Sequence, residues 1–178
     1  MSKLISYIAI SLDGKIAAKN GDFSWLDEVP NPEQTDYGYS DFIRNIGTTI
    51  MGNETYKVVL NIDMPFPYAE QTNYVVTRNK SLTTDENVTF MSGDIPAQVA
   101  DLKAQSSKDI WLIGGGQVNA ICLKAGLLDE IIVHIMPYVL GEGIPIFADE
   151  ELKTFLTLKS TKTYSSGVVE LRYTVNKT

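Results

Sequence analysis

Cysteine and histidine are almost absent from this sequence. Its 178 residues include one cysteine, Cys122, and one histidine, His134. One cysteine cannot form an internal disulfide, and no Cys/His cluster has the spacing of zinc ligands. We therefore expect no metal site and a reducing, cytoplasmic environment. His134 lies in an apolar segment, which indicates a packing residue rather than a general acid.

The sequence also lacks long apolar runs and an excess of basic charge. No apolar run is long enough to span a bilayer, and the first residues lead into a strand-like segment without the features of a signal peptide. The 15 Lys and Arg residues are outnumbered by 22 Asp and Glu residues, which gives a net charge of −7. Because binding to nucleic-acid backbones requires clustered positive charge, we expect neither a nucleic acid nor a membrane as a partner.

The overall composition is that of an ordinary globular protein. Hydrophobic residues make up 44% and charged residues 21% of the chain, which supplies enough apolar material for a core. Domains commonly contain about 100–200 residues. We therefore expect a single domain that spans residues 1–178.

Apolar strand-like segments alternate with amphipathic helical segments along the chain. We expect strands at residues 4–12, 48–51, 73–77, 88–91, 110–113, 130–136, 156–164 and 168–175. We expect helices at residues 36–46 and 54–60, after a cap at Asp94, and at residues 118–125. This alternation is typical of a mostly parallel sheet with helices on both faces, and the last two strands should form a hairpin.

Glycines occupy two junctions between a strand and a helix. Residues 114–116 are all glycine and follow the apolar segment 110–113. Free backbone N–H groups and the positive end of the next helix would favour an anion there, although such a turn can also serve packing alone. At the second junction Gly52 precedes Thr55, whose hydroxyl could cap the helix or contact a phosphate. Neither junction has the spacing of the Rossmann fingerprint.

Several segments resemble the dihydrofolate-reductase-like superfamily, and together they cover nearly the whole chain. Four segments resemble the reductase domain of the bifunctional riboflavin-biosynthesis deaminase/reductase: residues 11–17, 21–25, 137–143 and 145–147. Residues 50–56 and 113–116 are closer to dihydrofolate reductase itself. The resemblance implies an α/β, three-layer fold with a central mixed, mostly parallel eight-stranded sheet. It also implies NADPH as the cofactor, stretched across the carboxyl ends of the strands.

The resemblance assigns residues of this chain to the cofactor. Those expected to face the nicotinamide are Ala9, Ile10 and Ile16. Those expected to meet the phosphates are Gly52, Asn53, Thr55, Gly115, Gly116, Gln117 and Val118. Thr77 and Arg78 should flank the adenosine ribose. Arg78 is the one charged residue among the positions matched to the 2′-phosphate, so a preference for NADPH over NADH depends on it; without the resemblance it would be an ordinary surface arginine.

Candidate substrate residues are fewer, and each has a structural alternative. Counting back without gaps from Gly52 places Asp36 where dihydrofolate reductase has its pterin-binding acid, so Asp36 could orient or protonate the substrate, or could cap a helix. Asp13 is a weaker candidate for the same role. Lys15 could contact a substrate phosphate or lie in solvent. Trp25 could close over the nicotinamide or pack its own loop.

Departures from both branches bear on the substrate. Gln71 or Thr72 occupies the place of the arginine that holds the folate glutamate tail, and Gly114 replaces the glutamate that begins the glycine turn of the riboflavin branch. An Asp-Asn-Pro segment of that branch is also missing after Gly52. The predicted function is an NADPH-dependent reductase of a small heterocycle, resembling 5-amino-6-(5-phosphoribosylamino)uracil reductase. The alternatives are a dihydrofolate or pteridine reductase and a non-catalytic nucleotide-binding module.

The last strands predict a homodimer, because the riboflavin branch commonly pairs through its late strands. Leu156 and Leu158 share one face of the expected strand, while Phe155 and Thr157 take the other. Both faces therefore need a cover, which a second copy or a helix of the same chain could supply.

Overall fold

The computed structural model describes residues 2–148 and 151–177. In chain order the elements are β1 (Leu4–Ile10), β2 (Lys15–Ala17), the 3₁₀ helix η1 (Ser24–Glu28), α1 (Tyr39–Ile43), β3 (Ile46–Gly52), α2 (Asn53–Leu60), β4 (Thr72–Val76), β5 (Thr89–Met91), α3 (Ile95–Gln105), β6 (Asp109–Gly114), α4 (Gly116–Lys124), β7 (Glu130–Ile135), β8 (Ile144–Pro145), β9 (Leu156–Thr163) and β10 (Val169–Val175). Within these residues, no helix is long and apolar enough to cross a membrane.

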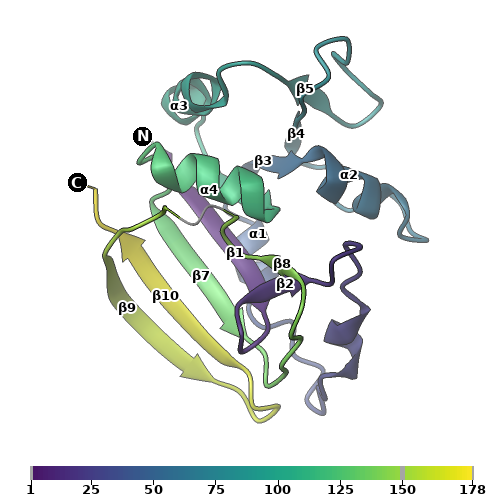
Figure 1. The fold of residues 1–178 in the computed structure, drawn as a ribbon, viewed down its shortest axis with the longest axis vertical. Coiled ribbons are helices and arrows are strands. Elements are labelled where there is room, and N and C mark those ends of the chain that lie inside the picture. Colours follow the sequence, from purple (N-terminus) through teal and green to yellow (C-terminus); the bar gives the residue numbers. More distant parts are fainter. Residues whose placement is uncertain (1, 149–150, 178) are drawn as a thin grey trace.

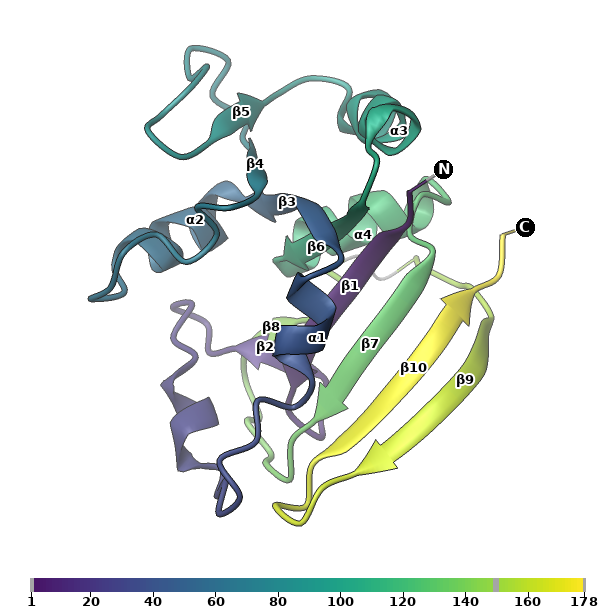
Figure 2. The same ribbon diagram turned by 180° about the vertical axis from the view of Figure 1, so that it is seen from behind.

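One sheet of eight strands organises the molecule, in the order β5-β4-β3-β6-β1-β7-β10-β9 (Figure 1; β6 is labelled in Figure 2). The neighbours from β5 to β7 are parallel, whereas β10 is antiparallel to both β7 and β9. The eight-stranded, mixed and mostly parallel sheet and the final hairpin are therefore confirmed. β2 and β8 form a separate antiparallel pair that the sequence pattern did not indicate.

Helices cover both faces of this sheet, as two opposite views show (Figures 1 and 2). α3 and α4 lie on one face, and α1 lies on the other. Along β1, Ile8 and Ile10 join the apolar cluster that includes α3 and α4, whereas Ile5 and Tyr7 pack with Phe42 of α1. Because successive side chains of a strand point to opposite faces, a strand covered on both sides is apolar almost throughout.

The helix expected at residues 36–46 is shorter in the structure, where α1 covers Tyr39–Ile43. Tyr37 and Gly38 have φ values of 54° and 87°, in the left-handed region that a right-handed helix excludes. At the other end, Ile46 already belongs to β3. The prediction was wrong at both ends because Ile46 buries its side chain in the same apolar cluster as α1, and therefore continues the helical spacing from within a strand.

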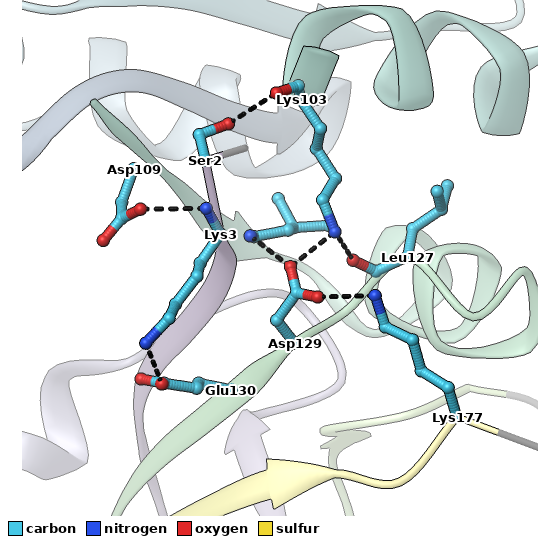
Figure 3. A network of polar contacts seen from close by, with 9 residues as sticks. Ser2, Lys3, Lys103, Asp109, Leu127, Asp129, Glu130 and Lys177 are labelled. Atoms are coloured by element: carbon cyan, nitrogen blue, oxygen red, sulfur yellow. Dashed lines mark hydrogen bonds and ion pairs between the residues drawn. The ribbon is translucent and has the colours of Figure 1, made fainter. Parts of the chain in front are cut away.

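A network of charged groups closes the edge of the sheet where the parallel strands begin (Figure 3). Lys103 of α3 is buried, and its ammonium group donates to the Asp129 carboxylate and, at 2.5 Å, to the Leu127 carbonyl oxygen. Asp129 also accepts the Leu4 N–H at 2.8 Å and pairs with Lys177 at 2.8 Å. Burial raises the pKa of the Asp129 carboxyl, but these donors outweigh burial and hold that pKa below its usual value.

We expect the substitution Lys103→Met to lower the free energy of unfolding by about 2–3 kcal/mol, because it leaves the Asp129 charge poorly compensated. The loss should be smaller than for a fully isolated charge, since Lys177 and the Leu4 N–H remain. Urea unfolding measures the difference. Lys57→Met is the matched control, because the Lys57–Glu54 pair is exposed and such pairs contribute at most about 1 kcal/mol. Equal losses in both variants would contradict this prediction.

Candidate functional site

Two strand-to-helix junctions meet at the opposite edge of the sheet, where the parallel strands end. β3 and β6 are parallel neighbours, with Met51 opposite Gly114. A Cβ atom at Gly52 would lie 3.2 Å from Val118 Cγ2 and 3.9 Å from the backbone nitrogen of Gly115. The N-termini of α2 and α4 are therefore adjacent, which brings together the residues expected to meet the phosphates.

Both helix N-termini present backbone N–H groups. α2 begins after Gly52 and α4 after Gly115, and neither has a side-chain hydrogen bond at its N-cap. The first N–H groups of a helix have no partner within the helix and carry partial positive charge, so they favour an anion. Thr55 Oγ1 and Ile16 Cδ1 lie 3.5 Å and 3.7 Å from the position of a Cβ atom at Gly115. The Thr55 hydroxyl therefore lies beside the second junction.

The three consecutive glycines have different structural roles. Gly114 has a φ of 109°, which favours glycine, and its peptide bond to Gly115 is cis. A Cβ atom at Gly116 would lie 2.3 Å from the Pro145 carbonyl oxygen, so this glycine allows β8 to pack against α4. At Gly115 the nearest atom would be Thr55 Oγ1 at 3.5 Å. Packing thus explains the glycine at 116, while the glycine at 115 keeps side-chain atoms away from the junction.

The residues expected around the adenosine ribose also come together. Arg78 follows β4, and its Nη2 donates to the Gln117 side-chain oxygen at 3.2 Å. Gln117 lies in the first turn of α4, so the guanidinium group lies beside the N-terminus of that helix. Thr77 is buried and its hydroxyl accepts the Asn79 N–H at 3.1 Å. Asn53, at the start of α2, donates to the neighbouring Glu54 and remains at the surface.

The residues expected around the nicotinamide lie at the end of β1 and on β2. Ala9 and Ile10 are the last residues of β1 and point to opposite faces of the sheet. Ile16 reaches Gly115, as described above, and Lys15 is half-buried in β2, opposite β8. Trp25 is 4% exposed in the apolar cluster under its own loop. It therefore packs the loop, which is the alternative to closing over the site.

Asp36 has the geometry of a capping residue. Its two carboxylate oxygens accept the N–H groups of Gly38 and Ser40, both at 2.9 Å, at the start of α1. Hydrogen bonds from the Ser40 hydroxyl and from these two N–H groups lower the pKa of the Asp36 carboxyl to about 2. An ionised carboxylate cannot donate a proton near neutral pH. The lowered pKa argues against the proton-donor role of Asp36 and favours the role in orienting the substrate, and both roles stay predictions.

A buried carboxylate on the α1 face escaped the sequence analysis. Glu170 of β10 is 4% exposed and accepts hydrogen bonds from Arg172 Nε at 2.6 Å, Tyr164 OH at 3.1 Å and His134 Nε2 at 3.2 Å. Burial raises the pKa of Glu170, but the donors, led by Arg172, outweigh burial and hold that pKa below its usual value. The sequence offers no signal for it, because Glu170, Arg172 and Thr174 alternate with apolar residues as on the solvent face of an ordinary strand.

His134 joins this carboxylate to the loop that precedes α1. His134 Nε2 lies 3.1 Å from the Tyr37 carbonyl oxygen, and Tyr7 OH donates to the same oxygen at 3.0 Å. Because Glu170 and this carbonyl are both acceptors, we assign the proton of the neutral ring to Nε2. Burial lowers the pKa of His134, which favours the neutral ring, and the buried ring packs against Tyr7 with the ring centroids 4.9 Å apart. β1 and β7 thus fix the loop that carries Asp36.

The chain has the dihydrofolate-reductase-like three-layer α/β fold. The solved structure of dihydrofolate reductase from Enterococcus faecalis, complexed with NADP(H) and RAB-propyl, aligns with a TM-score of 0.71. The sequence identity is 16%, and the alignment covers 98% of this chain and 97% of that enzyme. The chain belongs to the RibD C-terminal domain family, whose model matches residues 2–170.

Two further relatives cover nearly the whole chain. The uncharacterized protein YwjB of Bacillus subtilis is 40% identical over 171 residues, which are 96% of this chain and 97% of YwjB. A putative riboflavin biosynthesis protein from Shewanella sp. PV-4 has a solved structure that aligns with a TM-score of 0.86 and 28% identity, over 98% of this chain and 99% of that protein. The suspected superfamily is thus confirmed, and the family supports an oxidoreductase.

Proposed function

We propose that this protein is an NADPH-dependent reductase of a small planar heterocycle, similar to the 5-amino-6-(5-phosphoribosylamino)uracil reductase of riboflavin biosynthesis. The main observation in its support is that the N-termini of α2 and α4, after Gly52 and Gly115, lie next to each other and have no side-chain caps. A pyrophosphate is an anion that accepts hydrogen bonds, so it fits this point. The family, and the NADP(H) bound to an enzyme of the same fold, support this choice.

The residues assigned to NADPH surround this junction in a consistent order. The N–H groups of the first turns of α2 and α4 would hold the phosphates. Arg78, beside Gln117, would bind the 2′-phosphate through its planar guanidinium group. Ile16, next to Gly115, would contact the nicotinamide near the end of β1. When bound, NADPH supplies a hydride from C4 of its nicotinamide ring.

The side chains of this site position the substrate rather than protonate it. The pKa of Asp13 and that of Asp36 are both lowered to about 2, so both carboxyls are ionised near neutral pH. The substrate would present an electrophilic C=N or carbonyl carbon to this hydride, and solvent water would supply the proton for the adjacent heteroatom. Asp36, on the loop fixed by His134, is the candidate acceptor for an N–H group of the substrate.

A hydride-transfer screen should detect NADPH oxidation with a pyrimidine or pteridine substrate. Dihydrofolate and its tail-less dihydropterin counterpart should have similar kcat/KM values, because neither Gln71 nor Thr72 offers a cation to the glutamate tail. The decrease in absorbance of NADPH measures the rates. Tight NADPH binding without turnover of any compound would favour the non-catalytic module, and a strong preference for dihydrofolate would contradict the assignment at residues 71 and 72.

NADPH should raise the melting temperature more than NADH does at equal concentration. NADPH has a 2′-phosphate that NADH lacks, and the ligand that binds the folded state more tightly stabilises it more. Arg78→Ala should weaken NADPH binding by about tenfold and remove the difference between the cofactors. Arg44→Ala is the control, since Arg44 is exposed and pairs with Asp41 away from the site. Equal shifts from both cofactors in the unmodified protein would contradict the role of Arg78.

A homodimer through β9 completes the proposal. All eight residues of β9 are exposed, as is Phe155 just before it, so no helix among the described residues covers this strand. We expect light scattering at micromolar concentration to give the mass of two chains, and Leu158→Lys to give the mass of one. Leu60→Lys is the control, because Leu60 is similarly exposed, at 52% against 50% for Leu158. A mass of one chain for the unmodified protein would contradict the dimer.

A further inference from the structure

The carboxylate of Asp13 connects two segments that are far apart in the sequence. It accepts hydrogen bonds from the Ser11 hydroxyl at 2.7 Å, the Leu140 N–H at 3.0 Å and the Gly141 N–H at 2.8 Å. Both of its oxygens are used, although Asp13 is exposed. The hydrogen bonds with Ser11 and the two N–H groups lower the pKa of the Asp13 carboxyl to about 2. The group therefore stays charged and acts as an acceptor at all physiological pH values.

One of these segments, residues 137–148, continues to the N-terminus of α4. The Ala148 N–H donates to the Gly116 carbonyl oxygen at 3.0 Å, and Asn119 Nδ2 donates to the Ile146 carbonyl oxygen at 2.9 Å. The close approach of Pro145 to Gly116 adds a third contact. This end of the segment is therefore held on α4 by contacts that do not involve Asp13.

The other segment is the turn that leads from β1 into β2. It carries Ile16, whose side chain reaches Gly115. Besides Asp13, it is joined to residues 137–148 by backbone contacts: Leu12 N–H to the Tyr138 carbonyl oxygen at 2.8 Å, Ile146 N–H to the Gly14 carbonyl oxygen at 3.2 Å, and the short β2–β8 pair. The pair contains a register irregularity between Lys15 and Ala17. The hydrogen bonds of Asp13 to the N–H groups of residues 140 and 141 thus add to this backbone pairing in holding the turn that carries Ile16.

We propose that Asp13 is a positioning residue that sets the nicotinamide half of the cofactor site independently of the adenine half. It fixes the turn that carries Ile16 against a segment which is itself held on α4. The inference rests on the proposed NADPH site. Arg78 and Gln117, which would bind the adenine half, contact each other and make no hydrogen bond to Asp13 among the described residues.

The charge of Asp13 matters because all three of its partners are donors. An asparagine at this position keeps one acceptor oxygen but turns an NH₂ group toward a backbone N–H, so at least one of the two contacts to residues 140 and 141 is lost. The turn is then free to move away from α4, while the contacts of Ala148 and Asn119 keep the 137–148 segment on the helix.

The test compares two ligands in the variant Asp13→Asn. NADPH contains both halves of the cofactor, whereas adenosine 2′,5′-bisphosphate contains only the adenine half. Titration calorimetry should show NADPH binding weakened by about fivefold to tenfold, the effect of losing one or two hydrogen bonds. Binding of adenosine 2′,5′-bisphosphate should be unchanged, which also demonstrates that the variant is folded.

Asp22→Asn is the matched control. Asp22 is also an exposed loop aspartate, and it accepts the hydroxyl at 3.0 Å and the N–H at 2.9 Å of Ser24, within its own loop. This variant should bind both ligands as the unmodified protein does. A generic effect of removing a loop carboxylate would appear in both variants, whereas an effect specific to the 137–148 segment appears only in Asp13→Asn.

Three results would overturn the inference. Unchanged NADPH binding in Asp13→Asn would show that backbone pairing alone holds the turn. Equal weakening of both ligands would show a general structural role. If the unmodified protein binds neither ligand, the proposed function fails as well. The first two results, in contrast, concern Asp13 alone and leave the proposed function standing. Should Asp13→Asn not fold, Asp13→Ser is the second variant, because its shorter side chain has a single oxygen in place of the carboxylate that accepts the Leu140 and Gly141 N–H groups; a loss confined to NADPH supports the inference, and no such loss overturns it.

Discussion

The close approach of two backbones at the carboxyl edge of the sheet is the constraint on which the candidate site depends. β3 and β6 are parallel neighbours, so their helices start at the same edge. Gly52 and Gly115 keep side chains out of the space between those helices, and a Cβ atom at Gly52 would already lie 3.2 Å from Val118. A side chain at either position would occupy part of the space between the two helix N-termini, where their positive potential favours an anion.

The two edges of the sheet are built in opposite ways. At the edge where the strands begin, the buried Lys103 and its partners satisfy their charges among themselves, so that edge is closed. At the edge where they end, helix N–H groups have no side-chain caps. The polar groups of the first edge bind one another and stabilise the fold, whereas the helix N–H groups of the second edge can bind a ligand.

The strands and the glycine junctions were predictable because each is encoded locally. A window of about ten residues is enough to recognise an apolar run such as β1, or a Gly-Gly-Gly turn after a strand. The end of α1 was not predictable, since Ile46 keeps the helical spacing while it belongs to a strand. The contact between Glu170 and His134 was not predictable for a different reason: it joins residues far apart in the chain, and it depends on β10 lying beside β7. The three-way contact of Asp13 likewise required the tertiary structure.

Alternation along β1 has a consequence for how this protein can diverge from its relatives. Ala9 and Ile10 are consecutive, yet their side chains lie on opposite faces of the sheet. Of the two residues, Ile10 lies on the α4 face, whereas Ala9 lies on the face of the loop fixed by Tyr37, His134 and Glu170. A substitution at position 10 therefore changes the packing against α4, and a substitution at position 9 changes the packing against that loop. Two neighbouring positions of one strand can thus diverge independently, because each of them contacts a different layer of the molecule.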